Sequence, residues 1–202
     1  MDVTGHPGHP YPASLQVDTP ERMARWRPLV QWLLAIPHML ILYALGVLSW
    51  AVGIVSWFVV LITGRLPASL AGVQAMYLRY SDRTMTYAGF LVEEYPPFAF
   101  DTTGDDPGTY HGVLVDFEPE LEHRNRLTTF FRWLLVIPHL IALFVVGFVA
   151  TLAHIVGFFA VLITGRWPEG LRNIVVGFFR WTLRVNAYHM LLTDRYPPFS
   201  LR

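Results

Sequence analysis

The fold is decided by one apolar stretch, HMLILYALGVLSWAVGIVSWFVVLI at residues 38–62, and by its repeat, HLIALFVVGFVATLAHIVGFFAVLI at residues 139–163. Neither stretch contains Asp, Glu or Arg. A helix of this length extends about 38 Å, whereas the hydrocarbon core of a bilayer is about 30 Å thick. Each stretch is therefore predicted to be a helix that crosses a membrane.

The charge-free runs around these stretches are longer and cover residues 28–64 and 133–165. They are too long for one straight span and slightly short for two spans joined by a turn. Pro37 and Pro138 offer one solution, because a proline ends or kinks a helix at the preceding residue. The alternative is an intramembrane hairpin in each run, bending near residues 46–53 and 147–157.

The composition also indicates an integral membrane protein. Apolar residues make up 53% of the 202 residues and charged residues 15%, whereas soluble domains carry about 25% charged residues. The formal net charge is zero, so no nucleic-acid partner is expected. The chain has no Cys and no Lys, which excludes disulfide scaffolds, thiol catalysis and Schiff-base catalysis. We expect no cofactor and no enzymatic activity.

A tandem duplication organises the chain. Three motifs return 101 residues later: WLLAIPH (32–38) as WLLVIPH (133–139), VLITGRLP (60–67) as VLITGRWP (161–168), and EYPPF (94–98) as RYPPF (195–199). A shorter echo precedes each copy, LQVD at 15–18 and VLVD at 113–116. We expect a disordered Gly/Pro/His tail at residues 1–12, membrane repeats at 13–99 and 113–202, and an acidic linker at 100–112.

A second, amphipathic helix is predicted in each copy, over about residues 70–92 and 171–192. Arg79 and Arg83 lie on one face of the first helix, and Arg180 and Arg184 repeat them in the second. Arginine forks recognise phosphate, so these residues are candidates for binding anionic lipid headgroups. The alternative is a polar face that extends toward the headgroups without a specific ligand. The predicted fold class is all-α: a long Pro-kinked apolar helix, or hairpin, then an Arg-faced helix in each copy.

Clusters of arginine precede both apolar runs, at positions 22, 25 and 27 and at 124, 126 and 132. The positive-inside rule places both clusters in the cytoplasm, which requires an even number of crossings per copy. The copies are then parallel and related by a pseudo-two-fold axis along the membrane normal. This predicts a multi-pass protein of the plasma membrane with both termini and the linker in the cytoplasm.

Small and polar residues in the apolar stretches suggest two further features. A line of mostly small residues indicates a helix-packing contact, either between the two copies or with another subunit. Its members are Gly46, Ser49, Gly53 and Ser56, with Gly147, Ala150, His154 and Gly157 in the second copy. His38 and His139 are equivalent, and a two-fold axis that brought them together would allow metal or haem ligation. The alternative is a structural histidine near the headgroups.

Several segments resemble a known family. RPLVQWLLAIPH (27–38), WFVVLITGRLP (57–67) and GFFRWTLRVNAYHMLLTDRYPPFSL (177–201) are similar to actinobacterial integral-membrane proteins of domain-of-unknown-function family 4389. The resemblance covers nearly the whole chain in two copies. It implies a membrane location, and it implies no activity or catalytic residues.

Three functions remain open from the sequence. The first is a non-enzymatic accessory, assembly or membrane-organising protein that contacts lipids, a membrane-protein partner or copies of itself. The second is a small transporter or channel with an arginine-lined path. The third is a haem-binding redox subunit that uses the paired histidines.

Overall fold

The structure is a computed structural model and describes residues 11–202. The described part contains six helices and two strands. Along the chain they are β1 (Ala13–Val17), α1 (Arg27–Leu34), α2 (Ile36–Thr63), α3 (Ala68–Ala88), β2 (Val113–Phe117), α4 (Arg126–Phe130), α5 (Arg132–Thr164) and α6 (Glu169–His189).

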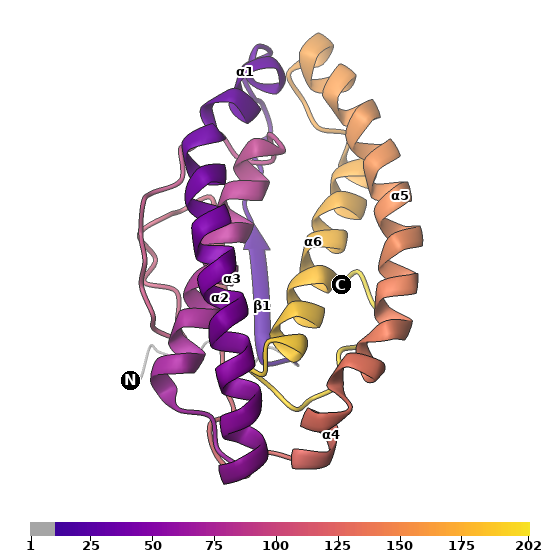
Figure 1. The fold of residues 1–202 in the computed structure, drawn as a ribbon. Helices are drawn as coiled ribbons and strands as arrows, with labels where there is room; N and C mark the ends of the chain where they lie inside the picture. Colours follow the sequence, from indigo (N-terminus) through magenta and orange to yellow (C-terminus); the bar gives the residue numbers. More distant parts are fainter. Residues whose placement is uncertain (1–10) are drawn as a thin grey trace, which may run out of the picture.

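The long apolar stretches form α2 and α5, which are uninterrupted helices (Figure 1). The hairpin alternative is therefore wrong, because the chain does not bend at either glycine pair. Pro37 lies in the first turn of α2, where a proline is tolerated. Pro138 lies inside α5 without ending it. Both helices end at a glycine with φ of 71°, Gly64 and Gly165, where a residue with a side chain would be strained.

The all-α prediction is wrong in one respect, because β1 and β2 form a two-stranded antiparallel sheet. Leu15 pairs with Val115 at the centre of the sheet. β2 contains the VLVD echo, and β1 contains the first three residues of LQVD and ends before Asp18. Their alternating apolar side chains, Ala13 and Leu15 in β1 and Val113 and Val115 in β2, are buried on one face.

The sheet interlocks the two copies. The strand β1, which precedes the first copy, packs on α6 of the second copy, and β2 packs on α3 of the first. A shared core joins Leu15, Val115, Leu78 and Leu183. Because each strand covers the other copy's helix, the two copies are parts of one folded unit.

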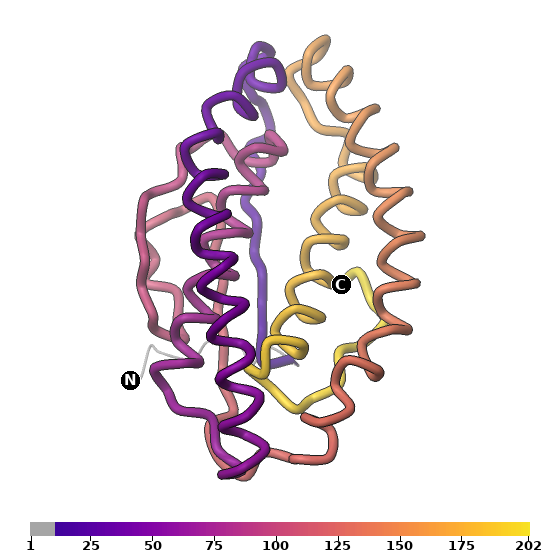
Figure 2. Tube along the Cα trace, in the orientation of Figure 1, coloured from indigo at the N-terminus to yellow at the C-terminus, as the bar shows by residue number. Residues whose placement is uncertain are grey.

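The copies are inverted relative to one another. The end of α2 meets the start of the second copy, where the Arg124 backbone N–H donates to the Gly64 carbonyl. The end of α5 meets the start of the first copy, where the Met23 N–H donates to the Gly165 carbonyl. Figure 2 shows α2 and α5 running in opposite directions. The prediction of parallel copies is therefore wrong: the pseudo-two-fold axis is perpendicular to the long helices.

The helices occupy two levels above the sheet. α3 and α6 pack on the buried face of the sheet, and α2 and α5 pack against α3 and α6 on the other side. In Figure 1 the long helices lie nearer the viewer than β1. Within residues 11–202, only α2 and α5 are long and apolar enough to cross a membrane. Of the second helices, α3 is mostly buried, and α6 is buried on one side.

Two predicted segments differ from expectation in the described residues. The tail was predicted to extend to residue 12, but Tyr11 is buried and its hydroxyl donates to the Arg195 carbonyl. Residues 1–10 of that tail lie outside the described part. In the predicted acidic linker, residues 101–106 pack against α3 through Arg79 and Arg83.

Candidate functional site

The first candidate group, the arginines of α3, is buried and bonded within the chain. The Arg79 guanidinium donates to four backbone carbonyls, those of Val115, Asp101, Thr103 and Gly104, at 2.6–3.2 Å. Arg83 donates to the Asp106 carboxylate at 2.7 Å. The side chains of Arg83 and Asp106 are each 2% exposed. These bonds fix the linker onto α3 and β2.

The arginines of α6 occupy the equivalent places in the second copy. Arg180 donates to the Leu15 carbonyl at 3.0 Å, as Arg79 does to Val115. Since Leu15 and Val115 are register partners, each arginine binds the strand that precedes the other copy. Arg184 donates to the Ser200 carbonyl at 2.5 Å. All four arginines therefore anchor strands or loops of the chain, and this geometry does not favour a headgroup site on α3.

Each histidine of the IPH motifs lies in an aromatic cage built by its own copy. The Nδ1 atom of His38 shares a hydrogen bond of 2.6 Å with the Tyr80 hydroxyl. The ring stacks on Phe98 at 4.2 Å between centroids, with Tyr95 at 4.9 Å. The YPPF segment thus returns to cover the start of α2, where the Tyr95 hydroxyl also donates to the Leu34 carbonyl.

The second cage repeats the first with one substitution. Trp181 replaces Tyr80, and its indole N–H donates to His139 Nδ1 at 3.1 Å. Phe199 stacks on His139 at 3.9 Å. The expected pairing of His38 with His139 does not occur, because each lies near the start of its own long helix and these starts are at opposite ends of the molecule. No group of three or more potential metal ligands occurs within residues 11–202.

The line of small residues faces the second helix of its own copy, not an interface between the two long helices. A Cβ on Gly46 would lie 3.6 Å from Tyr77, and one on Gly147 would lie 3.1 Å from Phe178. Gly157 is the tightest position, since a Cβ there would overlap the Trp167 ring. Three further members are buried, namely Ser49, Ser56 and Ala150. Gly53 is half-buried. Two members also contact the other copy: the Ser49 hydroxyl donates to the Met190 sulfur at 4.0 Å, and the His154 ring lies 4.5 Å from Phe90.

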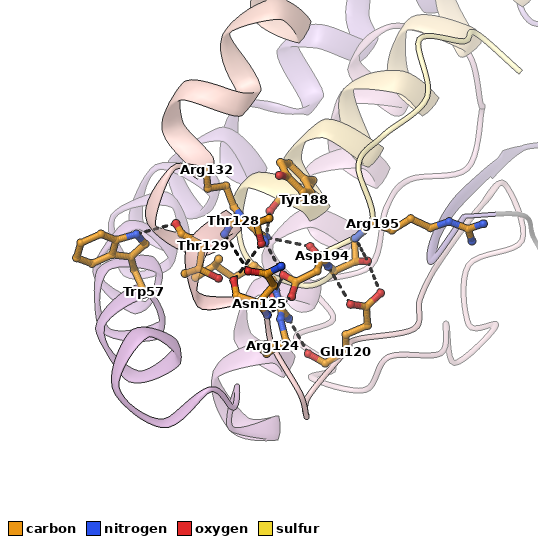
Figure 3. A network of polar contacts seen from close by, with 12 residues as sticks. Trp57, Glu120, Arg124, Asn125, Thr128, Thr129, Arg132, Tyr188, Asp194 and Arg195 are labelled. Carbon is orange, nitrogen blue, oxygen red and sulfur yellow. Dashed lines mark hydrogen bonds and ion pairs between the residues drawn. The ribbon is translucent and has the colours of Figure 1, made fainter.

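A polar network joins the start of α5 to the end of α6 (Figure 3). The Asp194 carboxylate accepts hydrogen bonds from Arg124 at 2.7 Å and from Arg132 at 2.5 Å. Burial alone would raise the pKa of Asp194, but the Asn125 backbone N–H and the two arginines lower it below its usual value. One carboxylate thus pairs with two arginines from the start of the second copy, so the network is a structural joint.

The same network connects the two copies. The Trp57 indole of α2 donates to the Thr129 carbonyl of α4 at 3.0 Å, which Figure 3 also shows. Arg132 donates to the carbonyls of Tyr188 and Thr193. Its Nε atom is buried and has no hydrogen-bond partner among the described residues. In the sequence Arg132 is recognisable only as a member of an arginine cluster, because its buried partners lie more than fifty residues away.

A cavity of about 480 Å³ lies beside this network. It is bounded by α2 and α3 of the first copy and by the start of α5 and the end of α6 of the second. Gly46, Ser49 and Gly53 line it, and none of the four candidate arginines does. The small residues are recognisable in the sequence, but the space that they leave open is not.

The comparison with known families gives one match, found in both copies. A family model described as "Domain of unknown function (DUF4389)" matches residues 25–99 and 126–200. No curated protein and no solved structure matches the chain. The matched ranges contain the IPH, TGR and YPPF motifs, so both histidine cages and all four arginines belong to the repeated family unit.

Proposed function

Because the chain belongs to the DUF4389 family, whose model covers both inverted copies, we propose that the two copies act together as one membrane-inserting unit. In this proposal the protein is a non-enzymatic membrane-organising component. It inserts α2 and α5 side by side into one leaflet, with both helices parallel to the membrane plane. The interior helices and the sheet then lie on the aqueous side.

The exposed surface of the long helices supports insertion. The largest exposed side chains form equivalent stripes, with Tyr43 and Phe58 on α2 matched by Phe144 and Phe159 on α5. Tyr43 is 78% exposed and Phe144 is 81% exposed. Patches of this extent are rare on monomeric soluble proteins and mark contact with a partner or a membrane.

The observation that carries the in-plane orientation is the position of the linker. Gln74 and Tyr77 of α3 contact Ser49 and Gly46 near the middle of α2, and Arg79 holds residues 101–104 at about that level. Figure 2 shows the segment between α3 and β2 running beside these helices over the middle of their length. An upright α2 would therefore place this irregular, exposed backbone in the hydrocarbon core.

Such a placement is unfavourable, because exposed irregular backbone has no hydrogen-bond partners in lipid. Asp101 and Asp105 are also exposed in this segment, and a charged carboxylate at the bilayer centre costs roughly 2.5–3.5 kcal/mol on insertion scales. With α2 and α5 in the membrane plane, the linker stays in water. The pseudo-two-fold axis then lies along the membrane normal.

The in-plane orientation also accounts for the arginine clusters. The clusters at the starts of the two copies lie at opposite ends of the molecule, so upright helices would place them on opposite sides of the membrane. Lying flat, both clusters reach the same aqueous side, as the positive-inside rule favours. We therefore place the protein in the cytoplasmic leaflet of the plasma membrane.

The absence of cysteine in the natural chain allows a direct test with single-cysteine variants. Arg65 and Arg166 are exposed at the ends of α2 and α5, and hence at opposite ends of the molecule. Arg65→Cys and Arg166→Cys should both resist a membrane-impermeant maleimide added outside intact cells. Both should react when the cytoplasmic side is opened.

Upright crossing predicts a different result, with one of the two cysteines labelled from each side. In the in-plane arrangement, Asp105→Cys in the linker should be labelled under the same conditions as the cysteines at the two helix ends. Ile54→Cys, on the exposed face of α2, serves as the embedded control and should react only after solubilisation. Recovery of the protein in the soluble fraction would reject membrane insertion itself.

A further inference from the structure

The cavity between the copies differs from its counterpart in the other half of the molecule. Gly53 lines the cavity, and the equivalent residue of the second copy is His154. The His154 ring contacts Phe90 and lies 5.7 Å from the Trp167 ring. It borders two separate hollows of about 480 and 360 Å³, both more open than the cavity at Gly53.

A second substitution contributes to this difference. Trp167 replaces the Leu66 of the first copy, stacks on Phe90 at 5.1 Å and donates its indole N–H to the Phe90 carbonyl at 2.8 Å. The aromatic cluster thus lies between two open hollows on one side of the pseudo-two-fold axis. On the other side, Gly53 lines a single and more enclosed cavity.

The rim of the cavity belongs to the lipid-facing surface. Trp50, Phe58 and Trp133 all line it, and their exposed fractions are 67%, 54% and 64%. The cavity therefore opens onto the same exposed surface that the proposed insertion places against hydrocarbon. In that position lipid chains, not water, are the molecules available to fill it.

The polar groups inside the cavity are few and mostly satisfied. The Gln74 amide donates to the Ser49 carbonyl at 2.9 Å and accepts from the Ser49 hydroxyl. Arg132 also lines the cavity, and its two terminal nitrogens bond to the carbonyls of Tyr188 and Thr193 and to Asp194. A hydrocarbon chain matches this lining, because it needs no hydrogen-bond partner of its own.

We propose that this cavity binds one acyl chain of a membrane phospholipid, held between α2 and the start of α5. Its volume lies within the range of small-molecule sites, roughly 300–1,000 Å³. The inference rests on the proposed membrane insertion for the source of the lipid. Beyond the general contact with the leaflet, the protein would then bind one lipid molecule at a defined site. This site exists on only one side of the pseudo-two-fold axis.

The test is a titration of delipidated protein in detergent with palmitoyl-oleoyl phosphatidylglycerol, followed by native mass spectrometry. The natural chain should retain one lipid. Gly53→Leu should lower the retained fraction at least tenfold, because its side chain extends into the cavity; a Cβ at Gly53 is 3.4 Å from Gln74, an ordinary contact. Val55→Leu adds bulk at an exposed position of the same helix and should retain the lipid.

Further measurements separate the possible causes of a negative result. Gly46→Leu provides a second filling variant, and thermal unfolding of each variant reports whether it is folded. Equal retention by folded Gly53→Leu and Val55→Leu would overturn the site, as would retention of no lipid by the natural chain. Retention of oleic acid in place of the phospholipid would also overturn the assignment. Flotation with liposomes tests insertion separately, since the titration in detergent does not depend on it.

Discussion

Asp82 is the only acidic residue of α3, and it occupies a position that is apolar in the second copy. Its equivalent, Leu183, is part of the shared core. Burial raises the pKa of Asp82 to about 8 from an ordinary value of 3.8. The folded protein thus binds a proton near neutral pH that the unfolded chain has released. The contribution of Asp82 to the free energy of unfolding should therefore be greatest at acidic pH. It should fall as the pH rises from about 4 to about 8.

The variant Asp82→Asn should remove this pH dependence. At pH 9 it should be more stable than the natural chain, by an amount on the order of a few kcal/mol, whereas the two should be similar near pH 4. Chemical unfolding in detergent at both pH values measures the difference. The control is Asp105→Asn in the exposed linker. If the free energy of unfolding of Asp82→Asn changed with pH as steeply as that of the natural chain, the carboxylate would be ionised and paired in the folded protein.

The two equivalent arginines that bind the strands should differ in their effect on stability. Arg79 is 3% exposed and holds four carbonyls, while Arg180 is half-buried and holds the Leu15 carbonyl. Arg79→Ala leaves several buried acceptors and Asp106 with fewer partners, and should cost about 3–5 kcal/mol. Arg180→Ala should cost about 1 kcal/mol. Equal losses in denaturant unfolding would contradict this structural role.

At the level of elements, α2 and α5 should determine membrane binding through their exposed stripes. The double variant Tyr43→Glu with Phe144→Glu puts one charge on each long helix, at equivalent exposed positions. Each charge should oppose insertion by roughly 2.5–3.5 kcal/mol at full depth and less near the interface. The fraction that floats with liposomes should therefore fall sharply. The control Thr109→Glu, in the exposed linker, should float like the natural chain. If the exposed face of α2 and α5 contacts a protein partner and not lipid, the double variant should float like the natural chain as well.

The sequence predicted the elements whose signals are local. The two apolar helices and the amphipathic helices after TGR follow from patterns within about 30 residues. The strands were missed because five residues give a weak signal, and their partner lies about a hundred residues away. The inverted arrangement was missed for a related reason: the arginine clusters were interpreted for upright helices, and the sequence holds no direct sign of the orientation of the sheet.

For the candidate sites, too, the sequence indicated local features and missed the contacts between distant segments. In each cage the histidine and the Tyr and Phe of YPPF are motif residues that the duplication marks, but their convergence depends on the YPPF segment returning to the start of the long helix. Periodicity placed Arg79 and Arg83 on one face and could not identify Asp106 or the carbonyls that this face meets. The cavity depends on differences between the copies, at Gly53 and His154 and at Leu66 and Trp167, which become meaningful only once those positions are adjacent in space.

At the level of the whole molecule, the exchange of strands makes the two copies interdependent. A chain divided between Gly108 and Thr109, both exposed, separates residues 1–108 from residues 109–202. Each half then lacks the strand that covers its second helix and one of the two strands of the sheet. Neither half can bury the core formed by Leu15, Val115, Leu78 and Leu183.

We therefore expect each half to aggregate when it is produced alone and the two halves to assemble when they are produced together. The full chain carrying a protease site at Gly108 is the control, and it should stay intact in size-exclusion chromatography after cleavage. Co-purification of the halves through a tag on one of them measures assembly. A monodisperse, folded half would show that one copy suffices for folding, and that the inverted pair arose by docking of two independent units.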